Sequence, residues 1–202
     1  MMKARLINLN TCAWAVLVVL LLGVSPAVQA QKLMEKGSKA LGIGLGLGYS
    51  YYGGYGVSTP WFLRAHLDIG VGNLGPTVFS IGPMIGYGQT TYRWRPSRNN
   101  EVRWTWTNTV IAARLALHYD FDVPRLDTYA GFAPGIRIET FRSRWTDGRD
   151  DDYDEGRYDY GGAYPAGAFF LGAAYGLTDQ VSLFGEFGFG YSWANIGLQI
   201  HF

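Results

Sequence analysis

Histidine and aspartate recur two residues apart in two stretches of the chain, His66 with Asp68 and His118 with Asp120. A third histidine, His201, precedes the C-terminal residue. In an extended strand, residues i and i+2 point to the same side, so each pair presents an imidazole together with a carboxylate. These groups could hold a transition metal, or they could belong to a hydrogen-bonded polar network. Because the three stretches are not neighbours in the strand order argued below, we favour the network and assign neither a metal site nor a cofactor.

Other charged side chains share the strand faces of these histidines and have mixed signs. The complete set is Arg64, His66, Asp68, Arg114, His118, Asp120, Arg137, Glu139, Glu186 and His201. A buried charge without a partner is strongly destabilising, whereas charges of both signs can neutralise one another. We therefore predict a polar plug inside the protein that fixes the register of its strands.

An acidic stretch contains Asp150, Asp152 and Asp154 at the spacing of calcium ligands. The position that requires glycine in a calcium-binding loop is Glu155, and the position that requires a bidentate acid is Gly161. We therefore expect a solvated acidic loop, with weak binding of divalent cations as the alternative.

The N-terminal thirty residues predict export from the cytoplasm. Lys3 and Arg5 precede an almost wholly apolar segment at 13–24, and the sequence VQA, which ends at Ala30, has the small-x-small pattern of a cleavage site. The apolar segment is shorter than the about 20 residues of a membrane-spanning helix. We expect a signal peptide at 1–30, a short polar leader at 31–39 and one domain at 40–202.

Glycine and aromatic residues are abundant in the chain, and charged residues are few. The 202 residues include 28 glycines, 16% aromatic residues and 16% charged residues, whereas soluble domains carry roughly 25% charged residues. The 17 basic and 16 acidic residues nearly balance, which predicts no general attraction to nucleic acid. From residue 40, apolar residues alternate with polar or small ones, which is the period of β-strands. Eight such runs occupy residues 41–51, 61–71, 79–89, 106–121, 128–141, 163–175, 181–191 and 195–202.

Short connections alternate with longer ones between these runs. Three tight turns read GNLGP, DVPRLD and GLTDQ, all rich in turn-forming residues. A basic loop flanked by tryptophan is expected at 92–103, and an acidic loop is expected at 142–162. In an up-and-down sheet, this order sends the short turns and both chain ends to one side. The sequence therefore predicts an all-β fold, an eight-stranded antiparallel up-and-down barrel.

The alternation fits both a soluble barrel with an apolar interior and a membrane barrel with an apolar exterior. The polar face is mostly Gly, Ala and Ser and has no lysine after Lys39, which is a poor coat for a surface in water. Aromatic residues gather at both ends of the runs, as they do at two membrane interfaces. They are Tyr49, Tyr51, Trp61, Tyr92, Trp94, Trp104, Trp106, Tyr191 and Trp193 at the long-loop end, and Tyr119, Phe121, Tyr129, Tyr175 and Phe202 at the short-turn end. We therefore predict a transmembrane barrel.

The chain ends on a strand pattern, in which Ile196, Leu198 and Ile200 alternate with polar residues or glycine. Lipid offers no partner for an unpaired backbone edge, so the last strand must pair with the first. The residues that resemble the C-terminal signal read by the insertion machinery of bacterial outer-membrane barrels are Asn195, Gly197, Ile200 and Phe202. The span 40–202 resembles the small eight-stranded outer-membrane proteins, which include the OmpX-like and OmpA-barrel families.

This resemblance implies an integral protein of the bacterial outer membrane, with the leader at 31–39 in the periplasm. Its expected partners are outer-membrane lipid, lipopolysaccharide, the insertion machinery and an external partner at the loops 92–103 and 142–162. Side chains fill the interior of an eight-stranded barrel. We therefore expect a non-enzymatic protein with an envelope-structural or surface-interaction role.

Two other functions remain open at this point. One is a narrow channel for ions or small solutes through the lumen. The other is a lipid-modifying enzyme at the rim, which needs a serine beside a histidine at the outer end. Since we expect all three histidines at the opposite end, no catalytic residues are assigned.

Overall fold

The computed structural model describes residues 32–48, 57–58, 61–94, 100–147 and 159–202. The predicted signal peptide lies outside the described residues, as do the acidic residues at 150–155. Within the described part of the chain, no helix is long and apolar enough to cross a membrane.

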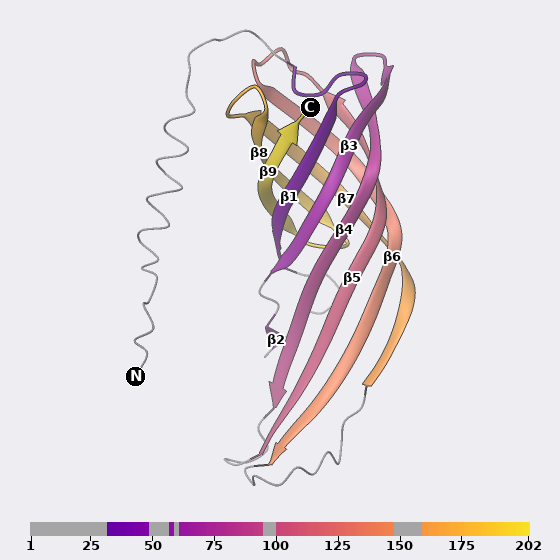
Figure 1. Cartoon of the computed structure of the whole chain (residues 1–202), viewed down its shortest axis with the longest axis vertical. Coiled ribbons are helices and arrows are strands. Elements are labelled where there is room, and N and C mark those ends of the chain that lie inside the picture. Colours follow the sequence, from indigo (N-terminus) through magenta and orange to yellow (C-terminus); the bar gives the residue numbers. More distant parts are fainter. Residues whose placement is uncertain (1–31, 49–56, 59–60, 95–99, 148–158) are drawn as a thin grey trace, which may run out of the picture.

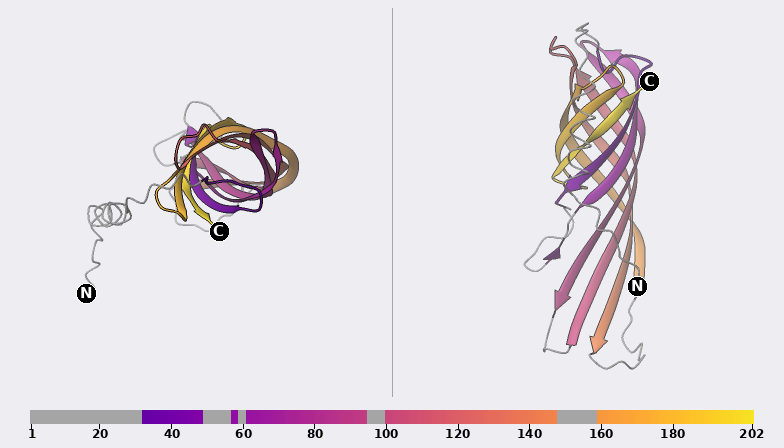
Figure 2. Two further views of the ribbon diagram at one scale, coloured as in Figure 1. Left: turned by 90° about the horizontal axis from the view of Figure 1, so that it is seen from above. Right: turned by 60° about the vertical axis from the view of Figure 1, so that its left-hand side comes forward.

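Nine strands form one antiparallel sheet, and eight of them close into a ring (Figures 1 and 2). The strands are β1 (Lys39–Leu47), β2 (Val57–Ser58), β3 (Phe62–Leu74), β4 (Thr77–Trp94), β5 (Asn100–Tyr119), β6 (Leu126–Asp147), β7 (Asp159–Gly176), β8 (Val181–Phe189) and β9 (Ala194–His201). Each strand of the ring pairs with the next, and β2 pairs only with β4, outside the ring. The predicted up-and-down barrel is confirmed.

The ring closes where β1 pairs with β9. Leu41 faces Ile200 and Ile43 faces Leu198 in this register. The backbone of Lys39 exchanges two hydrogen bonds with that of Phe202, with N···O distances of 3.1 and 3.0 Å. The last strand therefore pairs with the first and closes the ring, as the need to satisfy both backbone edges predicts.

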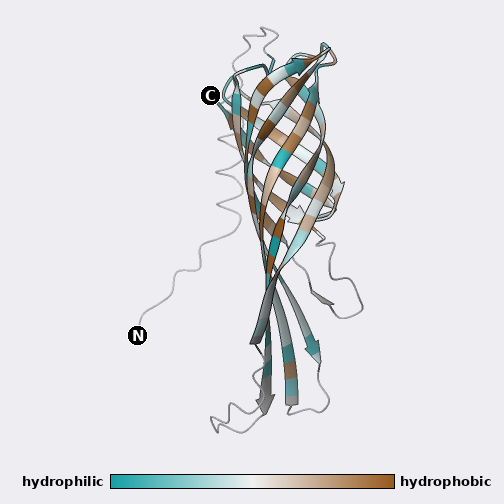
Figure 3. Ribbon diagram, turned by 90° about the vertical axis from the view of Figure 1, so that its right-hand side faces the viewer, coloured by the Kyte–Doolittle hydropathy of each residue, from teal (hydrophilic) through white to brown (hydrophobic). Residues whose placement is uncertain are grey.

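Apolar side chains cover the outside of the ring, and polar ones line the inside. Figure 3 shows hydrophobic and hydrophilic residues alternating along the strands of the ring. Ile43 is 57% exposed and Leu198 is 48% exposed, whereas Asp68 and Arg114 are fully buried. Aromatic and apolar side chains also point inward, which the sequence analysis did not assign. They are Phe62, Met84, Val110, Phe170 and Phe184. The interior is thus a packed core that surrounds charged groups.

Strands β4 to β7 are 18 to 22 residues long, about twice the length of β1, β8 and β9. The last pairing of β4 with β3 is at Gly88, and the β-ladder of β4, β5 and β6 continues beyond it. We call residues 89–94, 100–107, 140–147 and 159–161 the projecting sheet. It extends beyond the ring at the end opposite the C-terminus (Figure 1).

The projecting sheet corrects the predicted loops at 92–103 and 142–162, because much of both stretches is strand. Within these two stretches, residues 95–99 and 148–158 lie outside the described residues. The alternation continues through TTYRW and RWTWT, but the outward residues change from leucine and isoleucine to threonine and arginine. The sequence analysis interpreted this change in polarity as the end of each strand.

Several aromatic residues also differ from the predicted interfacial positions. Tyr129 and Tyr191 point into the ring and are 2% and 4% exposed. Tyr92, Trp104 and Trp106 lie on the face of the projecting sheet that continues the interior. Trp61 and Trp193 are exposed on the outside, as predicted.

Candidate functional site

A cluster of two arginines and two acids occupies the middle of the lumen. Arg114 Nε donates to both carboxylate oxygens of Asp68 at 3.0 Å, and an Arg114 terminal nitrogen donates to Glu186 Oε1 at 2.8 Å. A terminal nitrogen of Arg64 lies 2.6 Å from Glu186 Oε2. All four side chains are 5% exposed or less, and their formal charges cancel.

The cluster is held by strands that are distant in the sequence. Arg64 and Asp68 come from β3, Arg114 from β5 and Glu186 from β8. Tyr129 of β6 donates a hydrogen bond of 2.9 Å to Glu186. A network that joins four strands fixes their relative register, because a slip of β3, β5 or β8 separates at least one buried charge from its partner.

Aromatic rings complete the packing around the cluster. The guanidinium carbon of Arg114 lies 3.8 Å from the centre of the Phe170 ring, and that of Arg64 lies 5.5 Å from the centre of the Phe184 ring. His66 contacts the edge of Phe184, and its Nε2 lies 3.2 Å from the amide nitrogen of Gln199. The middle of the lumen is therefore filled.

A second polar group lies nearer the short-turn end. His118 Nδ1 is hydrogen bonded to Asp127 Oδ2 at 2.7 Å, and His118 Nε2 is hydrogen bonded to Ser80 Oγ at 2.9 Å. On the other side of the lumen, His201 Nε2 is hydrogen bonded to Ser182 Oγ at 2.8 Å. His201 is half-buried.

Asp120 differs from the predicted plug. Strand β5 ends at Tyr119, so Asp120 lies in the turn, where it accepts a hydrogen bond from the backbone of Asp122 and pairs with Lys32 at 3.3 Å. The sequence analysis missed Asp127 as the partner of His118. The two residues meet because β5 and β6 pair across the short turn, and their nine-residue spacing across the predicted turn DVPRLD is the signal that could have identified the contact. Among the described residues, no group of three or more His, Cys, Asp or Glu side chains is placed to hold a metal ion.

Ser80, His118 and Asp127 have the order of hydrogen bonds found in a nucleophile, base and acid triad. Ser80 has no exposed surface, so an acyl substrate has no access to its hydroxyl in this structure. We interpret this chain of hydrogen bonds as part of the polar plug.

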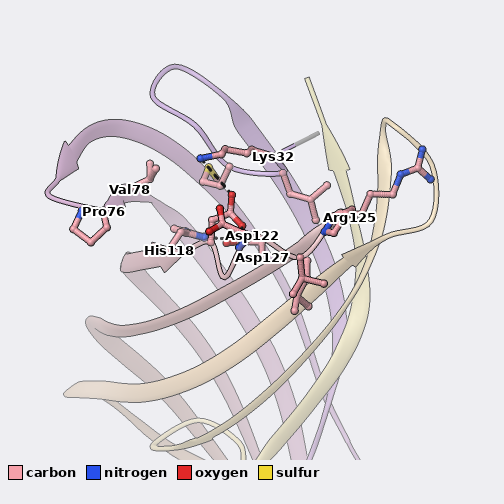
Figure 4. A pocket seen from close by; sticks show the side chains of 13 residues that line it. Lys32, Pro76, Val78, His118, Asp122, Arg125 and Asp127 are labelled. Carbon is pink, nitrogen blue, oxygen red and sulfur yellow. Dashed lines mark hydrogen bonds and ion pairs between the residues drawn. The ribbon is translucent and has the colours of Figure 1, made fainter. Parts of the chain in front are cut away.

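The leader covers the short-turn mouth of the ring. Leu33 and Met34 are buried, and the backbone of residues 37 and 38 exchanges hydrogen bonds of 2.7 and 3.0 Å with Gly70. A cavity of about 200 Å³ remains beneath it, lined in part by Lys32, His118, Asp122, Arg125 and Asp127 (Figure 4). The polarity of the leader gave no indication of this packing.

The other charged residues of the predicted set lie toward the projecting sheet. Arg137 pairs with Glu139 at 3.2 Å, and its guanidinium carbon lies 5.3 Å from the centre of the Tyr164 ring. Glu139 is buried, and Arg137 is half-buried. These two residues lie two positions apart on β6 and pair with each other.

The projecting sheet carries a row of arginines on the face that continues the outside of the ring. Arg93 of β4 faces Arg103 of β5, which in turn faces Arg144 of β6. Arg142 lies two residues before Arg144 and faces Thr105. We call these four residues the arginine row. A shallow depression of about 330 Å³ is lined by Gln89, Thr91, Arg93, Arg103, Thr105, Arg142 and Arg144.

The opposite face of the projecting sheet is aromatic. Tyr92 stacks on Trp104 with a centroid distance of 5.4 Å, and Phe141 contacts both Trp106 at 5.2 Å and Tyr160 at 4.6 Å. The two faces of this sheet therefore differ in chemistry, cationic outside and aromatic inside.

The residues of the predicted C-terminal signal lie on β9 and just after it. Asn195 points inward and accepts a hydrogen bond of 2.8 Å from Ser192, and Gly197 packs against Phe184 and the backbone of β1. Ile200 and Phe202 are exposed on the outside. Their recognition by the insertion machinery stays a prediction.

The closed ring, its apolar outer surface and its charged interior define an eight-stranded antiparallel up-and-down β-barrel with inverted polarity. No known protein family and no curated protein matches the sequence.

Among solved structures, the chain is similar to Ail, the attachment invasion locus protein of Yersinia pestis, at 12% identity and a TM-score of 0.45, over 83% of this chain and 100% of that one. A second structure of Ail, in complex with the heparin analogue sucrose octasulfate, matches over the same shares at 10% identity and a TM-score of 0.45. The N-terminal β-barrel domain of Pseudomonas aeruginosa OprF matches at 12% identity and a TM-score of 0.43, over 84% of this chain and 100% of that one.

Proposed function

We propose that the chain is an integral, non-enzymatic protein of the bacterial outer membrane with an envelope-structural or surface-interaction role, in which the projecting sheet faces the cell exterior. The observation that carries this proposal is the polarity of the ring. Large apolar side chains such as Ile43 and Leu198 are about half exposed on the outside, while Asp68, Arg114 and Glu186 are buried inside. Water would penalise the first group, and hydrocarbon satisfies it.

The strand lengths support a fixed placement in the bilayer. A tilted strand needs about 9–11 residues to cross the hydrocarbon, and β1, β8 and β9 have 8 or 9 residues. The additional residues of β4 to β7 therefore extend beyond the membrane. Short turns of outer-membrane barrels lie in the periplasm and the longer connections outside, which directs the projecting sheet outward.

Orientation can be tested by labelling single cysteines, because Cys12 is the only cysteine and lies in the predicted signal peptide. Tyr160→Cys places a thiol on the projecting sheet, and Lys36→Cys places one in the leader. In intact cells, a membrane-impermeant maleimide should label Tyr160→Cys alone, and after lysis it should label both. If only Lys36→Cys were labelled in intact cells, the orientation would be the opposite of the one proposed. Recovery of unlabelled protein in the soluble fraction would refute membrane insertion.

The surface-interaction role needs a separate test. A photoreactive residue in place of Trp94, which is exposed on the projecting sheet, should yield an adduct of defined mass on living cells. The same residue in place of Ile43 should yield adducts with lipid only. Identical adducts at both positions, or none at Trp94, would favour the purely structural role.

The lumen does not favour the channel alternative. Arg114, Phe62 and Phe184 are each 1% exposed or less and occupy its middle. A conducting path requires water-filled space at this level, and the packed side chains leave the structural and surface roles as the proposed function.

A further inference from the structure

The arginine row is an unusual feature for a β-sheet on electrostatic grounds. Like charges directly opposite one another on neighbouring strands destabilise a sheet, and here three arginines lie side by side across β4, β5 and β6. In the part of the chain that the structure describes, Glu101 is the acid that pairs with this group. It lies 3.0 Å from Arg103 and 4.0 Å from Arg93. Asp159 of β7 also faces Arg142 in the register. Four arginines therefore meet two acidic positions there.

Arg142 and Arg144 are the most available members of the row. Both are exposed, and Asp159 of β7 lies opposite Arg142 in the register. Their guanidinium groups project from the outer face, above the threonine and glutamine side chains that line the depression. A ligand on this face would meet fixed positive charge together with neutral hydrogen-bonding groups.

The height of the row on the barrel indicates which ligand it meets. Along β6, the outward residues run from Ile136 and Ile138 through Thr140 to Arg142 and Arg144. Arg142 follows Ile138 by four residues, about 13 Å along a strand. With the tilt of a barrel strand, the row lies just above the hydrocarbon, at the level of lipid headgroups.

A second depression continues the site toward the membrane. It has a volume of about 280 Å³ and is lined by Tyr87, Gln89, Thr105, Thr107, Thr140 and Arg142. Tyr87 lies at its lower end, where an amphipathic ring suits the boundary between hydrocarbon and headgroup. The outer face thus changes from apolar to aromatic, then to neutral polar, and finally to cationic.

We propose that the arginine row binds the phosphate groups of lipopolysaccharide in the outer leaflet and thereby anchors the projecting sheet at the membrane surface. Arginine is suited to this ligand because its planar fork donates two parallel hydrogen bonds to one phosphate. A phosphorylated glycolipid also supplies the anionic charge that offsets repulsion within the row. This inference rests on the proposed insertion and orientation, which the cysteine labelling tests independently.

Binding can be measured with the full mature chain in detergent micelles. The probe is diphosphoryl lipid A, compared with the same lipid A after enzymatic removal of both phosphates, and with inorganic phosphate. The native chain should bind diphosphoryl lipid A about tenfold more tightly than Arg142→Gln combined with Arg144→Gln, since each charge-assisted hydrogen bond contributes appreciably to affinity. The dephosphorylated lipid should not distinguish the two proteins.

The control variant combines Lys32→Gln and Lys36→Gln, which remove the same charge from the opposite end and should bind like the native chain. Arg142→Lys with Arg144→Lys keeps the charge but loses the fork, and it should show intermediate affinity. Raising the salt concentration should weaken binding of the native chain to diphosphoryl lipid A. Competition by millimolar inorganic phosphate alone would overturn the lipid assignment in favour of a free-phosphate site. Equal affinities of the native chain and the Gln variant would overturn the site itself, even where labelling places the sheet outside the cell.

Discussion

At the scale of single residues, the central ion cluster is the feature on which the barrel depends most. Arg114 donates to both carboxylate oxygens of Asp68 and also to Glu186, so two buried carboxylates share one guanidinium. The formal charges of the four side chains sum to zero, but each side chain by itself carries a charge. Loss of one member therefore costs more than the loss of its own contacts.

Arg114→Met should lower the free energy of unfolding by about 3–5 kcal/mol, because it leaves two buried carboxylates with one arginine. The measurement is denaturant unfolding in detergent, followed by the shift of the folded barrel on unheated gels. Arg137→Met at the lumen mouth is the matched control and should cost less, since Arg137 is half-buried. Equal losses in both variants would contradict the central role of the cluster.

Ser80 tests whether the hydrogen-bonded group with His118 and Asp127 is chemically active. Because Ser80 is fully buried, the native protein should not react with a fluorophosphonate probe. Ser80→Ala should cost about 1 kcal/mol of stability, as expected for one hydrogen bond. Covalent labelling of the native chain that Ser80→Ala abolishes would instead identify a serine hydrolase.

Gly42 marks a point where the backbone of β1 lies close to a buried ring. A Cβ atom at this position would lie 2.2 Å from His66 Cε1, and His66 is held by Phe184 and Gln199. Gly42→Ala should therefore destabilise the barrel by about 1–3 kcal/mol through overpacking. Gly185→Ala is the control, because a Cβ there meets nothing within 4 Å. If both variants melt at the same temperature, the space beside His66 is not the limiting feature.

At the scale of elements, β9 has two roles at once. It closes the ring against β1, and the residue that follows it, Phe202, is 67% exposed on the outside. The pairing with β1 uses the backbone, so the Phe202 side chain is not needed to hold the closed ring together. Lys39 Nζ lies 5.9 Å from the centre of the Phe202 ring. The exposed ring is accessible for recognition during insertion, as the resemblance to the C-terminal signal predicts.

Phe202→Ser should reduce the amount of protein assembled in the outer membrane several-fold while leaving the refolded barrel in detergent intact. The measurement compares membrane fractions from cells with refolding of the purified chain. Phe121→Ser removes a similarly exposed ring, 62% against 67%, at the same end of the barrel and should have little effect on assembly. A parallel loss of refolding in Phe202→Ser would show a structural contribution rather than a signal.

The edge of the projecting sheet formed by β7 has features that oppose pairing with another strand. Beyond Phe169, the edge of β7 has no β8 partner among the described residues. Pro165 lies on this edge, and three glycines accompany it at 161, 162 and 167. Proline on an edge strand blocks pairing with another chain, so this edge is poorly suited to adding a strand. The faces of the sheet are therefore better candidates for contact than its edge.

At the scale of the whole molecule, the lumen is blocked both at the short-turn mouth and in the middle. The leader covers the short-turn mouth, with Leu33 and Met34 buried beneath it, and the ion cluster with Phe62 and Phe184 fills the middle. The molecule therefore combines a filled barrel with an extension on one side.

Planar-bilayer recordings of the native chain should show no stable single-channel steps, because the lumen is packed. Phe62→Ala combined with Phe184→Ala removes two rings from the packed interior and should be the first variant to conduct. Steady steps in the native chain that change in Arg114→Ala or Glu186→Ala would instead support the channel alternative.

The amino-acid sequence alone determined the architecture and the direction of most strand faces. The run 163–175 is apolar or small throughout, so its facing did not follow from alternation. The period of two is a local property, so the outward Ile43 and Leu198 and the inward Asp68 and Glu186 follow from alternation once closure is required. The same period also continued through the predicted loops, where threonine and arginine replaced leucine on the outer face. An analysis of alternation without regard to hydropathy would have extended those strands.

Only the tertiary structure decided which side chains meet. Arg114 joins both Asp68 and Glu186 because of the register between strands that are distant in the sequence, and Asp127 meets His118 through the register of the β5–β6 hairpin. Register depends on every turn and bulge around the ring, and a shift at one pairing, such as the one between Gly70 and Gly72, carries through to the next. The arginine row has the same origin, since its members become neighbours only when three strands are aligned.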